Sequence, residues 1–413
     1  MTDPQPSGGK LILRLAPMIY GPTLIFALGE GAVIPLIPTM ATGLGASLAA
    51  TGAIASALVI GKLCGNLPSS WVVARLGERI AMSLASLVAM VGALGMLFAP
   101  NVAVLTIAIF ILGIATSAFG LARHAFMATR VPFTFRARAL SLLGGTFRLG
   151  TFVGPFVGAL MLGLTGHQTG AIWFLVGCIV VTFLLVWFGP DPETEFAARV
   201  QPQGTATSPI PLERDGIIGT MIKHRTVLSR IGVSAATLSA IRSARDIVLP
   251  IWGVSIGLDA QTILIVVGVA GALDFALFYV SGQVMDRFGR LWAVAPAMLL
   301  MAFGFLALSL THDLGAAGIW FAVFAAVIGL GNGLSSGILM TLGADLAPRH
   351  DPAPFLGSWR TLTDSGAVLA PLAFSGIAAV APIMVATGVM GGIGLVGVAG
   401  FLRWLPIFVP RKS

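Results

Sequence analysis

Charged residues are scarce in this 413-residue chain, where Asp, Glu, Lys and Arg together make up 10% of the sequence. A soluble domain carries about a quarter charged residues and is about half apolar. Hydrophobic residues here reach 57%, and the mean hydropathy is +0.97. The scarcity of charge therefore excludes an ordinary soluble domain and indicates that lipid is the solvent for most of the chain.

Cysteine is also scarce, and both Cys64 and Cys178 lie in apolar runs. We interpret them as packing residues, which carry no information about redox compartment. The five histidines are scattered, mostly in loops, so the sequence predicts neither a metal site nor a cofactor. A nucleophile paired with a base is lacking as well, and the chain is therefore not expected to be an enzyme.

Apolar runs fill most of the sequence, and a membrane-spanning helix needs about 20 such residues. Short loops separate the runs, except across 190–227, which mixes Pro, Gly, Thr and charges. The sequence thus predicts an all-α membrane protein with twelve transmembrane helices, in which a cytoplasmic linker (190–227) joins two six-helix bundles, 1–189 and 228–413. The predicted spans are 16–41, 48–73, 79–99, 102–126, 139–164, 170–189, 228–253, 260–284, 291–311, 317–343, 355–380 and 382–405.

The basic residues predict the orientation. With the N-terminus inside, Lys and Arg fall in the cytoplasmic segments, for example Lys10, Arg136 and Arg349, and the six external loops hold none. This asymmetry predicts a multi-pass protein of the inner or plasma membrane with both termini in the cytoplasm. Because the net charge of +8 is confined to short loops, it indicates membrane topology and not a nucleic-acid partner.

The two halves contain a repeated loop. In "SSWVVARLGER" (69–79) and "SGQVMDRFGR" (281–290), Arg75 and Gly77 align with Arg287 and Gly289 at an offset of 212. The second copy resembles the loop motif of the major facilitator superfamily through Gly282, Asp286, Arg287, Gly289 and Arg290. In that family the loop Asp joins a charge cluster that closes one conformation, and the first copy has Ala74 instead. The resemblance implies two pseudo-symmetric bundles around a cavity that opens alternately to either side.

A second motif lies in the predicted fifth helix, "GTFVGPFVGA" (150–159), with Gly150, Gly154, Pro155 and Gly158. It resembles a motif of the 12-helix drug:proton antiporter branch of the same superfamily. Glycines four apart also allow any two membrane helices to approach closely, so ordinary helix packing is the alternative. The corresponding segment of the second half, "GAVLAPLAFSG" (366–376), lies at an offset of 216.

Charged residues inside the predicted spans are expensive, and they usually face a cavity or a partner. At the repeat offsets, Glu30 corresponds to Arg242, Lys62 to Asp274 and Arg148 to Asp364, so opposite charges occupy equivalent positions. We expect a polar cavity near the midplane, lined by both halves. The deep charged residues are Glu30, Lys62, Arg148, Arg242, Arg245, Asp246, Asp274, Arg360 and Asp364.

Each deep charge has a structural and a functional interpretation. Burial disfavours an ionised carboxyl and a nearby cation favours it, so Glu30, Asp274 and Asp364 are the predicted proton-coupling groups. Asp246 is expected to pair with Arg242, four residues away on the same helix. The predicted substrate-binding or charge-pairing residues are Lys62, Arg148, Arg242, Arg245, Asp246 and Arg360. Arg123 and His124 fall near the cytoplasmic end of the fourth helix.

The sequence predicts a monomeric secondary transporter in the bilayer that works by alternating access, with protons as the coupling ion. The first hypothesis is proton-coupled efflux of a small organic compound, drug-like or metabolite. Uptake symport or exchange of an organic anion is the alternative, because the deep cations outnumber the deep acids. A lipid translocase or a membrane sensor is the second alternative, and ligand binding without gradient-driven flux would identify it.

Overall fold

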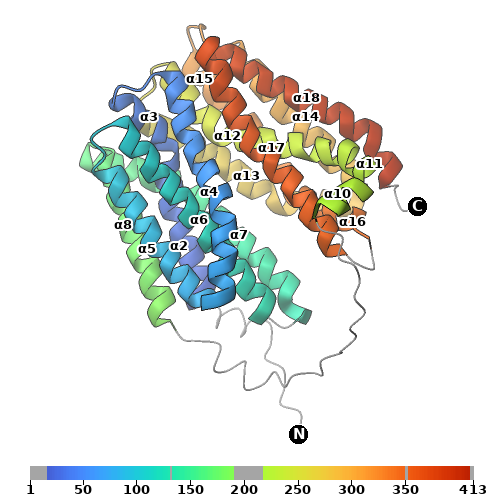
Figure 1. Ribbon diagram of the computed structural model, residues 1–413. Helices are drawn as coiled ribbons and strands as arrows, with labels where there is room; N and C mark the ends of the chain where they lie inside the picture. Colours follow the sequence, from blue (N-terminus) through green and yellow to red (C-terminus); the bar gives the residue numbers. More distant parts are fainter. Residues whose placement is uncertain (1–15, 131–132, 190–216, 349–351, 410–413) are drawn as a thin grey trace. The chain divides into compact units, whose positions relative to one another are not determined.

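The computed structural model describes residues 16–130, 133–189, 217–348 and 352–409, and within these ranges all regular structure is helical (Figure 1). Lys10, Arg349 and residues 190–216 of the predicted linker lie outside the described residues, and so do the side chains of Arg136 and its neighbours. The chain divides into two compact units. Unit 1 comprises Met1–Leu36 with Ala57–Pro209, and unit 2 comprises Ile37–Ser56 with Ile210–Ser413.

Unit 1 contains the helices of the first half of the sequence, apart from α3 (Ile37–Gly43). Its first membrane helix is irregular, because a 3₁₀ turn interrupts it at Pro35, which has no backbone N–H to donate. Most of α4 belongs to this unit, and the first residues of α4 belong to unit 2. The elements are η1 (Ala16–Tyr20), α2 (Gly21–Val33), η2 (Ile34–Leu36), α4 (Leu48–Leu76), α5 (Glu78–Leu97), α6 (Val102–Arg130), α7 (Phe133–Thr165) and α8 (Thr169–Phe188).

Unit 2 contains the second half together with α3. The predicted span 317–343 is interrupted, since α15 ends at Leu334 and α16 begins at Ile338, with Gly337 between them at φ +76°. A left-handed residue does not continue an α-helix, and glycine adopts that conformation without strain. The elements are α3 (Ile37–Gly43), α10 (Ile217–Lys223), α11 (Arg225–Val227), η3 (Leu228–Gly232), α12 (Val233–Ser255), α13 (Ala260–Phe288), α14 (Arg290–Ser309), α15 (Ala317–Leu334), α16 (Ile338–Leu346), α17 (Pro352–Val380) and α18 (Ile383–Phe408).

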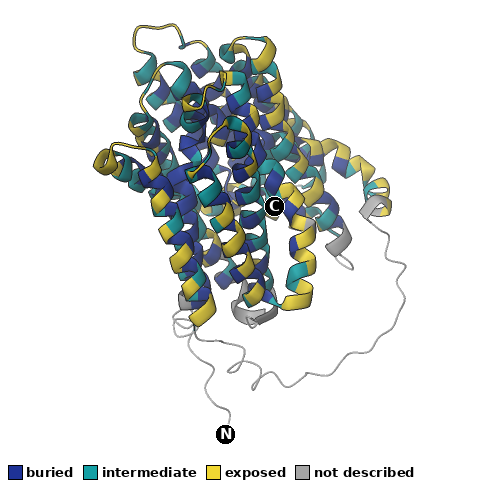
Figure 2. Ribbon diagram, turned by 60° about the vertical axis from the view of Figure 1, so that its left-hand side comes forward, coloured by how far each residue is buried: buried dark blue, intermediate teal, exposed yellow. Residues whose placement is uncertain are grey.

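Spanning length and composition confirm the predicted fold class of an all-α membrane protein. Within the described residues, 11 helical segments are long and apolar enough to cross a membrane. The remaining predicted span corresponds to α12, a 23-residue helix that carries Arg242, Arg245 and Asp246. Figure 2 shows helices with a buried side and an exposed side, and the exposed sides include large apolar residues such as Val91 and Ile319. In a membrane protein such surfaces face lipid.

The packing inside each unit confirms the sequence repeat. At several close helix crossings a glycine faces a residue so closely that an added Cβ would crowd it, and the same contact recurs in the other unit at offsets of 212 and 216. The repeat therefore extends from sequence to backbone contacts. The matched contacts are Gly92 on Leu112 with Gly304 on Ile328, Gly113 on Leu58 with Gly329 on Ala270, and Gly150 on Leu24 with Gly366 on Ala236.

The glycines of the predicted fifth helix line the side of α7 that packs on α2. A Cβ added at Gly154 would lie 2.6 Å from the Gly31 Cα, and one at Gly158 would lie 2.6 Å from the Ala32 carbonyl oxygen. Gly150 meets Ala27 in the same way, at 2.7 Å. These contacts give the motif a structural role in unit 1, and Pro155 lies inside the helix at this crossing.

Candidate functional site

Among the described residues of unit 1, Glu30 is the most deeply buried carboxyl, with 1% of its surface exposed. It lies in α2, and the Thr116 hydroxyl of α6 donates a hydrogen bond to its Oε1. Thr116 Oγ1 is also within hydrogen-bonding distance of the Leu112 carbonyl oxygen, at 2.9 Å. A hydroxyl has one proton to donate, so Thr116 can serve one of these two acceptors at a time.

Arg123 is the buried cation of this site and interacts electrostatically with Glu30. Its guanidinium carbon lies 4.7 Å from the centroid of the Phe147 ring of α7, and only 8% of the residue is exposed. Between the two polar residues of α6, Phe119 stacks on Phe26 of α2 at 4.7 Å. Thr116, Phe119 and Arg123 are spaced three and four apart, so they lie on one face of α6.

From the sequence, Arg123 was expected near the cytoplasmic end of the fourth helix, and Thr116 was not singled out. A sequence signal exists, because Thr116 and Arg123 are seven residues apart and share a helix face within an apolar run. The Arg123 guanidinium lies over the Phe147 ring, which comes from another helix and is 24 positions away along the chain. That contact was not visible in the sequence pattern.

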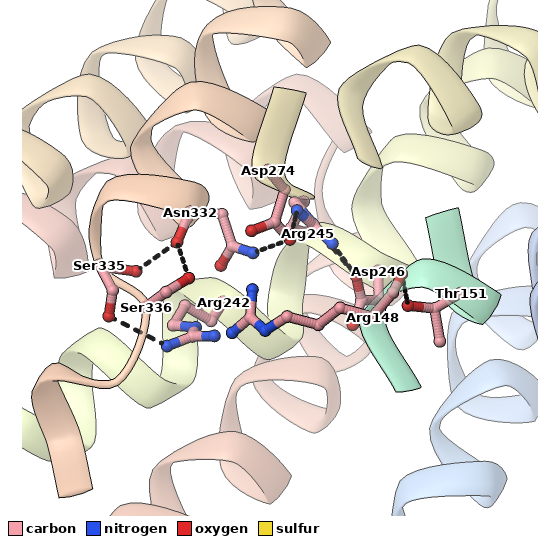
Figure 3. A network of polar contacts seen from close by, with 9 residues as sticks. All are labelled: Arg148, Thr151, Arg242, Arg245, Asp246, Asp274, Asn332, Ser335 and Ser336. Carbon is pink, nitrogen blue, oxygen red and sulfur yellow. Dashed lines mark hydrogen bonds and ion pairs between the residues drawn. The ribbon is translucent and has the colours of Figure 1, made fainter. Parts of the chain in front are cut away.

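The polar network of unit 2 centres on Arg245 of α12 (Figure 3). Its Nε and Nη2 each lie 3.1 Å from Asp246 Oδ1, and its Nη1 lies 3.3 Å from Asp274 Oδ2 of α13. The Asn332 side chain of α15 donates a 2.6 Å hydrogen bond to the same Asp274 oxygen. Asp274 is thereby held by a cation and an amide from two other helices.

Glycine at position 333 explains how α15 reaches Asp274. A Cβ added at Gly333 would lie 2.7 Å from the Asp274 carbonyl oxygen, so α13 and α15 are in backbone contact there. Asn332 is the preceding residue and is directed to the carboxylate. Past Asn332 the helix ends, and the Ser281 hydroxyl of α13 lies 2.7 Å from the Leu334 carbonyl oxygen and 2.9 Å from that of Ser336. Ser281 therefore holds the break between α15 and α16.

Arg242 and Asp246 are not paired as the sequence suggested. Asp246 binds Arg245, and Arg242 instead donates from Nη1 to the Ser335 carbonyl oxygen at 3.4 Å (Figure 3). The i, i+4 spacing is correct for a pair, but the break in the tenth predicted span presents an unwound carbonyl that the Arg242 guanidinium reaches. The sequence did not single out Asn332, Ser335 or Ser336, although an Asn within the apolar run "GLGNGLSSG" was a signal.

The other predicted deep charges lie in less enclosed surroundings. Arg360 and Asp364 pair along α17 at 3.5 Å, with side chains 77% and 46% exposed. Lys62 is half-buried at the middle of α4 and makes no hydrogen bond or ion pair with the described residues. Arg148 is half-buried on α7, next to Phe147. The roles of these residues stay predictions.

The repeated loops have matching turns and different polar contacts. Gly77 and Gly289 both have positive φ, +82° and +94°, which explains glycine at this turn in each half. In unit 2, Arg290 lies 2.9 Å from Asp345 and 3.6 Å from Asp286. In unit 1, Arg79 donates to carbonyl oxygens at the end of α8, including Val186 at 3.0 Å. Arg75 stacks on Trp71, 4.8 Å from the ring centroid, and gating roles for Gly282 and Arg287 stay predictions.

Two repeat-related units of spanning helices with charged residues buried at mid-helix define a secondary transporter of the membrane. The chain belongs to the Major Facilitator Superfamily, whose family model matches residues 22–371. This membership makes it a multi-pass membrane transporter and not an enzyme. The narrower resemblance to the drug:proton antiporter branch stays a prediction.

Individual relatives are distant. The chain is 24% identical over 180 residues to the galactose-proton symporter of Escherichia coli strain K12, a match that covers 43% of this chain and 38% of that protein. It resembles the structure of a POT family transporter in complex with a thioalcohol-conjugated peptide, with TM-score 0.74 and 11% identity over 94% of this chain and 96% of that one. The xylose transporter XylE from E. coli, in a partially occluded inward-open conformation, gives TM-score 0.67 and 14% identity over 97% and 99%. At identities of 11% and 14%, both structural similarities are evidence for the fold alone.

Proposed function

We propose that this chain is a proton-coupled secondary transporter of a small organic molecule that works by alternating access, with Glu30 as the proton-binding group. The observation that carries the proposal is the pair of acceptors available to Thr116. When Glu30 is ionised, Thr116 donates to its Oε1 and Arg123 supplies the nearby positive charge. When Glu30 is protonated, the hydroxyl can turn to the Leu112 carbonyl oxygen. Both protonation states of Glu30 therefore leave Thr116 with a partner.

Protonation also changes the electrostatics of unit 1. The ionised carboxylate attracts Arg123 in a poorly hydrated environment, where charges interact more strongly than in water. Protonation of Glu30 removes that attraction, and the Arg123 guanidinium then keeps its contact with the Phe147 ring. Protonation of Glu30 therefore changes the interaction between α2 and α6. Coupling to a transport cycle requires such a dependence of helix interactions on protonation.

Symport is the favoured direction of coupling. A galactose-proton symporter is among the relatives, and a small polar metabolite such as a sugar is therefore the first substrate class to test. Efflux by antiport was suggested by the glycines of the fifth helix. These glycines already have a packing role, and Gly366 makes the equivalent contact in unit 2, so helix packing alone accounts for them.

An organic anion is the second candidate substrate, and Lys62 favours it. An ammonium at the middle of a membrane helix is costly to insert and usually marks a functional site. Lys62 pairs with none of the described residues, so it is available to a carboxylate on a substrate. Changing Lys62 to Met should then abolish binding of the anion and leave a neutral, methyl-esterified analogue unaffected.

Transport by purified protein in proteoliposomes tests the proposal. An imposed proton gradient is applied to a panel of sugars and organic anions, and internal pH is followed together with substrate. For a symporter, substrate and protons should move in the same direction, and for an antiporter in opposite directions. Substrate flux that is indifferent to the proton gradient would contradict proton coupling. We place the protein in the inner or plasma membrane with both termini cytoplasmic, a proposal supported by the basic loops.

A further inference from the structure

Two arginines of unit 2, Arg230 in η3 just before α12 and Arg403 near the end of α18, stack on one tryptophan. The guanidinium carbon of Arg230 lies 4.3 Å from the centroid of the Trp404 ring, and that of Arg403 lies 5.0 Å from it. Both arginines are exposed, and neither forms an ion pair or a side-chain hydrogen bond with the described residues. We call Arg230, Arg403 and Trp404 the Arg–Trp cluster.

Close packing of α12 on α18 builds the Arg–Trp cluster. A Cβ at Gly397 would overlap Thr237, and one at Gly400 would overlap the Ser234 hydroxyl, so these glycines let the two helices approach. One turn beyond Gly400 lies Trp404. One turn before Ser234 lies Arg230, whose carbonyl oxygen accepts a hydrogen bond from the Ser234 hydroxyl at 3.1 Å. The close approach of the two helices therefore holds the arginine and the ring against each other.

The surroundings of the Arg–Trp cluster are apolar and exposed. Val233 on α12 is 48% exposed, and Leu402 and Ile407 on α18 are 52% and 62% exposed. In a transporter of this family such residues face lipid chains. A tryptophan beside such residues and close to a helix end is typical of the interface between hydrocarbon and headgroups. Arg230 and Arg403 lie near the ends of the predicted spans 228–253 and 382–405, where lipid phosphates are expected.

The repeat shows that the Arg–Trp cluster is a property of unit 2 alone. At the same offsets of 212 and 216, unit 1 has Met18, Trp187 and Phe188 in place of Arg230, Arg403 and Trp404. Packing of the equivalent helices in unit 1 therefore needs no arginine at these positions. The stacking of two cations on one ring is therefore found in unit 2 and has no counterpart at the equivalent positions of unit 1.

We propose that the Arg–Trp cluster binds the phosphodiester headgroup of an anionic phospholipid from the surrounding leaflet. Guanidinium groups match phosphate oxygens with paired N–H donors, and stacking on Trp404 holds the donors in place before the lipid arrives. The exposed Leu402 and Ile407 select a phosphate that carries acyl chains over a soluble one. The proposal is independent of the substrate and of the coupling ion.

Lipid retention by the full-length protein in detergent tests the proposal, measured by native mass spectrometry with phosphatidylglycerol or phosphatidylcholine of identical chains. Wild type should retain phosphatidylglycerol preferentially, and the double variant Arg230→Gln, Arg403→Gln should bind it about tenfold more weakly or worse. Arg75→Gln is the matched control, because Arg75 is a single arginine on Trp71. Its retention should equal that of wild type.

Three outcomes would overturn the proposal. The first is a double variant that retains phosphatidylglycerol like wild type, and the second is equal retention of the two lipids by wild type. In the third, millimolar inorganic phosphate displaces the lipid completely, which would indicate a soluble-anion site. Unchanged thermal unfolding of the double variant separates lost binding from lost folding. A Lys-for-Arg double variant should bind with intermediate strength, because it keeps the charge and loses the paired donors.

Discussion

The two units surround their buried carboxylates differently. Glu30 of unit 1 has one hydroxyl partner with a second acceptor available, and a cation that lies on an aromatic ring. Asp274 of unit 2 is bound by a guanidinium and an amide on one oxygen, and that guanidinium also binds Asp246. We propose that the first arrangement accommodates a change in the charge of the carboxyl, whereas in the second such a change would disturb contacts with two other helices. The repeated backbones therefore carry different polar contacts.

Removing the positive charge of Arg245 in unit 2 should give the largest effect on stability. Arg245→Gln removes the ion pair with Asp274, and breaking a buried pair of this kind costs about 3–5 kcal/mol. Thermal unfolding in detergent measures the loss. Arg360→Gln is the control, because this exposed pair along α17 should contribute about 1 kcal/mol or less. Adding Asp274→Asn to Arg245→Gln should recover part of the loss, and equal stability of wild type and Arg245→Gln would contradict the role of this ion pair.

Removing the hydroxyl of Thr116 should have the next largest effect. Thr116→Val deprives a buried carboxyl of its donor, and hydrogen bonds to charged groups contribute about 1.5–3 kcal/mol. The comparison is with Thr182→Val, since the Thr182 hydroxyl is buried and has no hydrogen-bond partner among the described residues. Thr182→Val should keep or raise the unfolding temperature. If both variants unfold alike, Thr116 does not stabilise Glu30.

Filling the close helix contacts should destabilise both units to a similar extent. Gly150→Ala and Gly366→Ala each place a methyl against the facing helix, and such overpacking costs about 1–3 kcal/mol. Gly144 of α7 is the control, because a Cβ there would meet nothing within 4 Å. Unfolding measurements on the three variants check the repeat. A large loss in one unit with none in the other would show that the pseudo-symmetry does not extend to packing energy.

The smallest predicted effect concerns the caps of the equivalent helices α4 and α13. Ser47 accepts from the Ala50 N–H at 3.2 Å, and Asp259 accepts from the Thr262 N–H at 2.9 Å, again at an offset of 212. Replacing either cap by Ala should cost about 1 kcal/mol near neutral pH.

These two caps should differ in their pH dependence. The Thr262 hydroxyl and N–H lower the pKa of Asp259, so its stabilisation is present above the unfolded-state pKa and is lost as pH falls through the lowered folded-state value. The effect of Asp259→Ala should shrink below about pH 4, and that of Ser47→Ala should not. Parallel pH profiles of unfolding for the two variants would contradict this account.

Hydrophobic runs and repeat offsets predicted the helices and their correspondence, because length and apolarity are local properties of a sequence. The partners of the deep charges were harder. The sequence assigned Asp246 to Arg242 by spacing, but Asp246 pairs with Arg245, and Arg242 donates to the carbonyl oxygen of Ser335. The guanidinium of Arg123 likewise lies over the Phe147 ring, which belongs to a different helix. The direction of a side chain depends on how its helix is rotated and packed, and neither can be read from a single sequence.

The most direct measurement of the central claim compares two transport modes in proteoliposomes containing wild type, Glu30→Gln or Asp313→Asn, with Asp313 serving as an exposed carboxylate control. One mode is accumulation driven by a proton gradient, and the other is exchange of labelled for unlabelled substrate without a gradient. The account predicts that Glu30→Gln loses accumulation and keeps exchange, whereas Asp313→Asn keeps both. Full proton-driven accumulation by Glu30→Gln would contradict it.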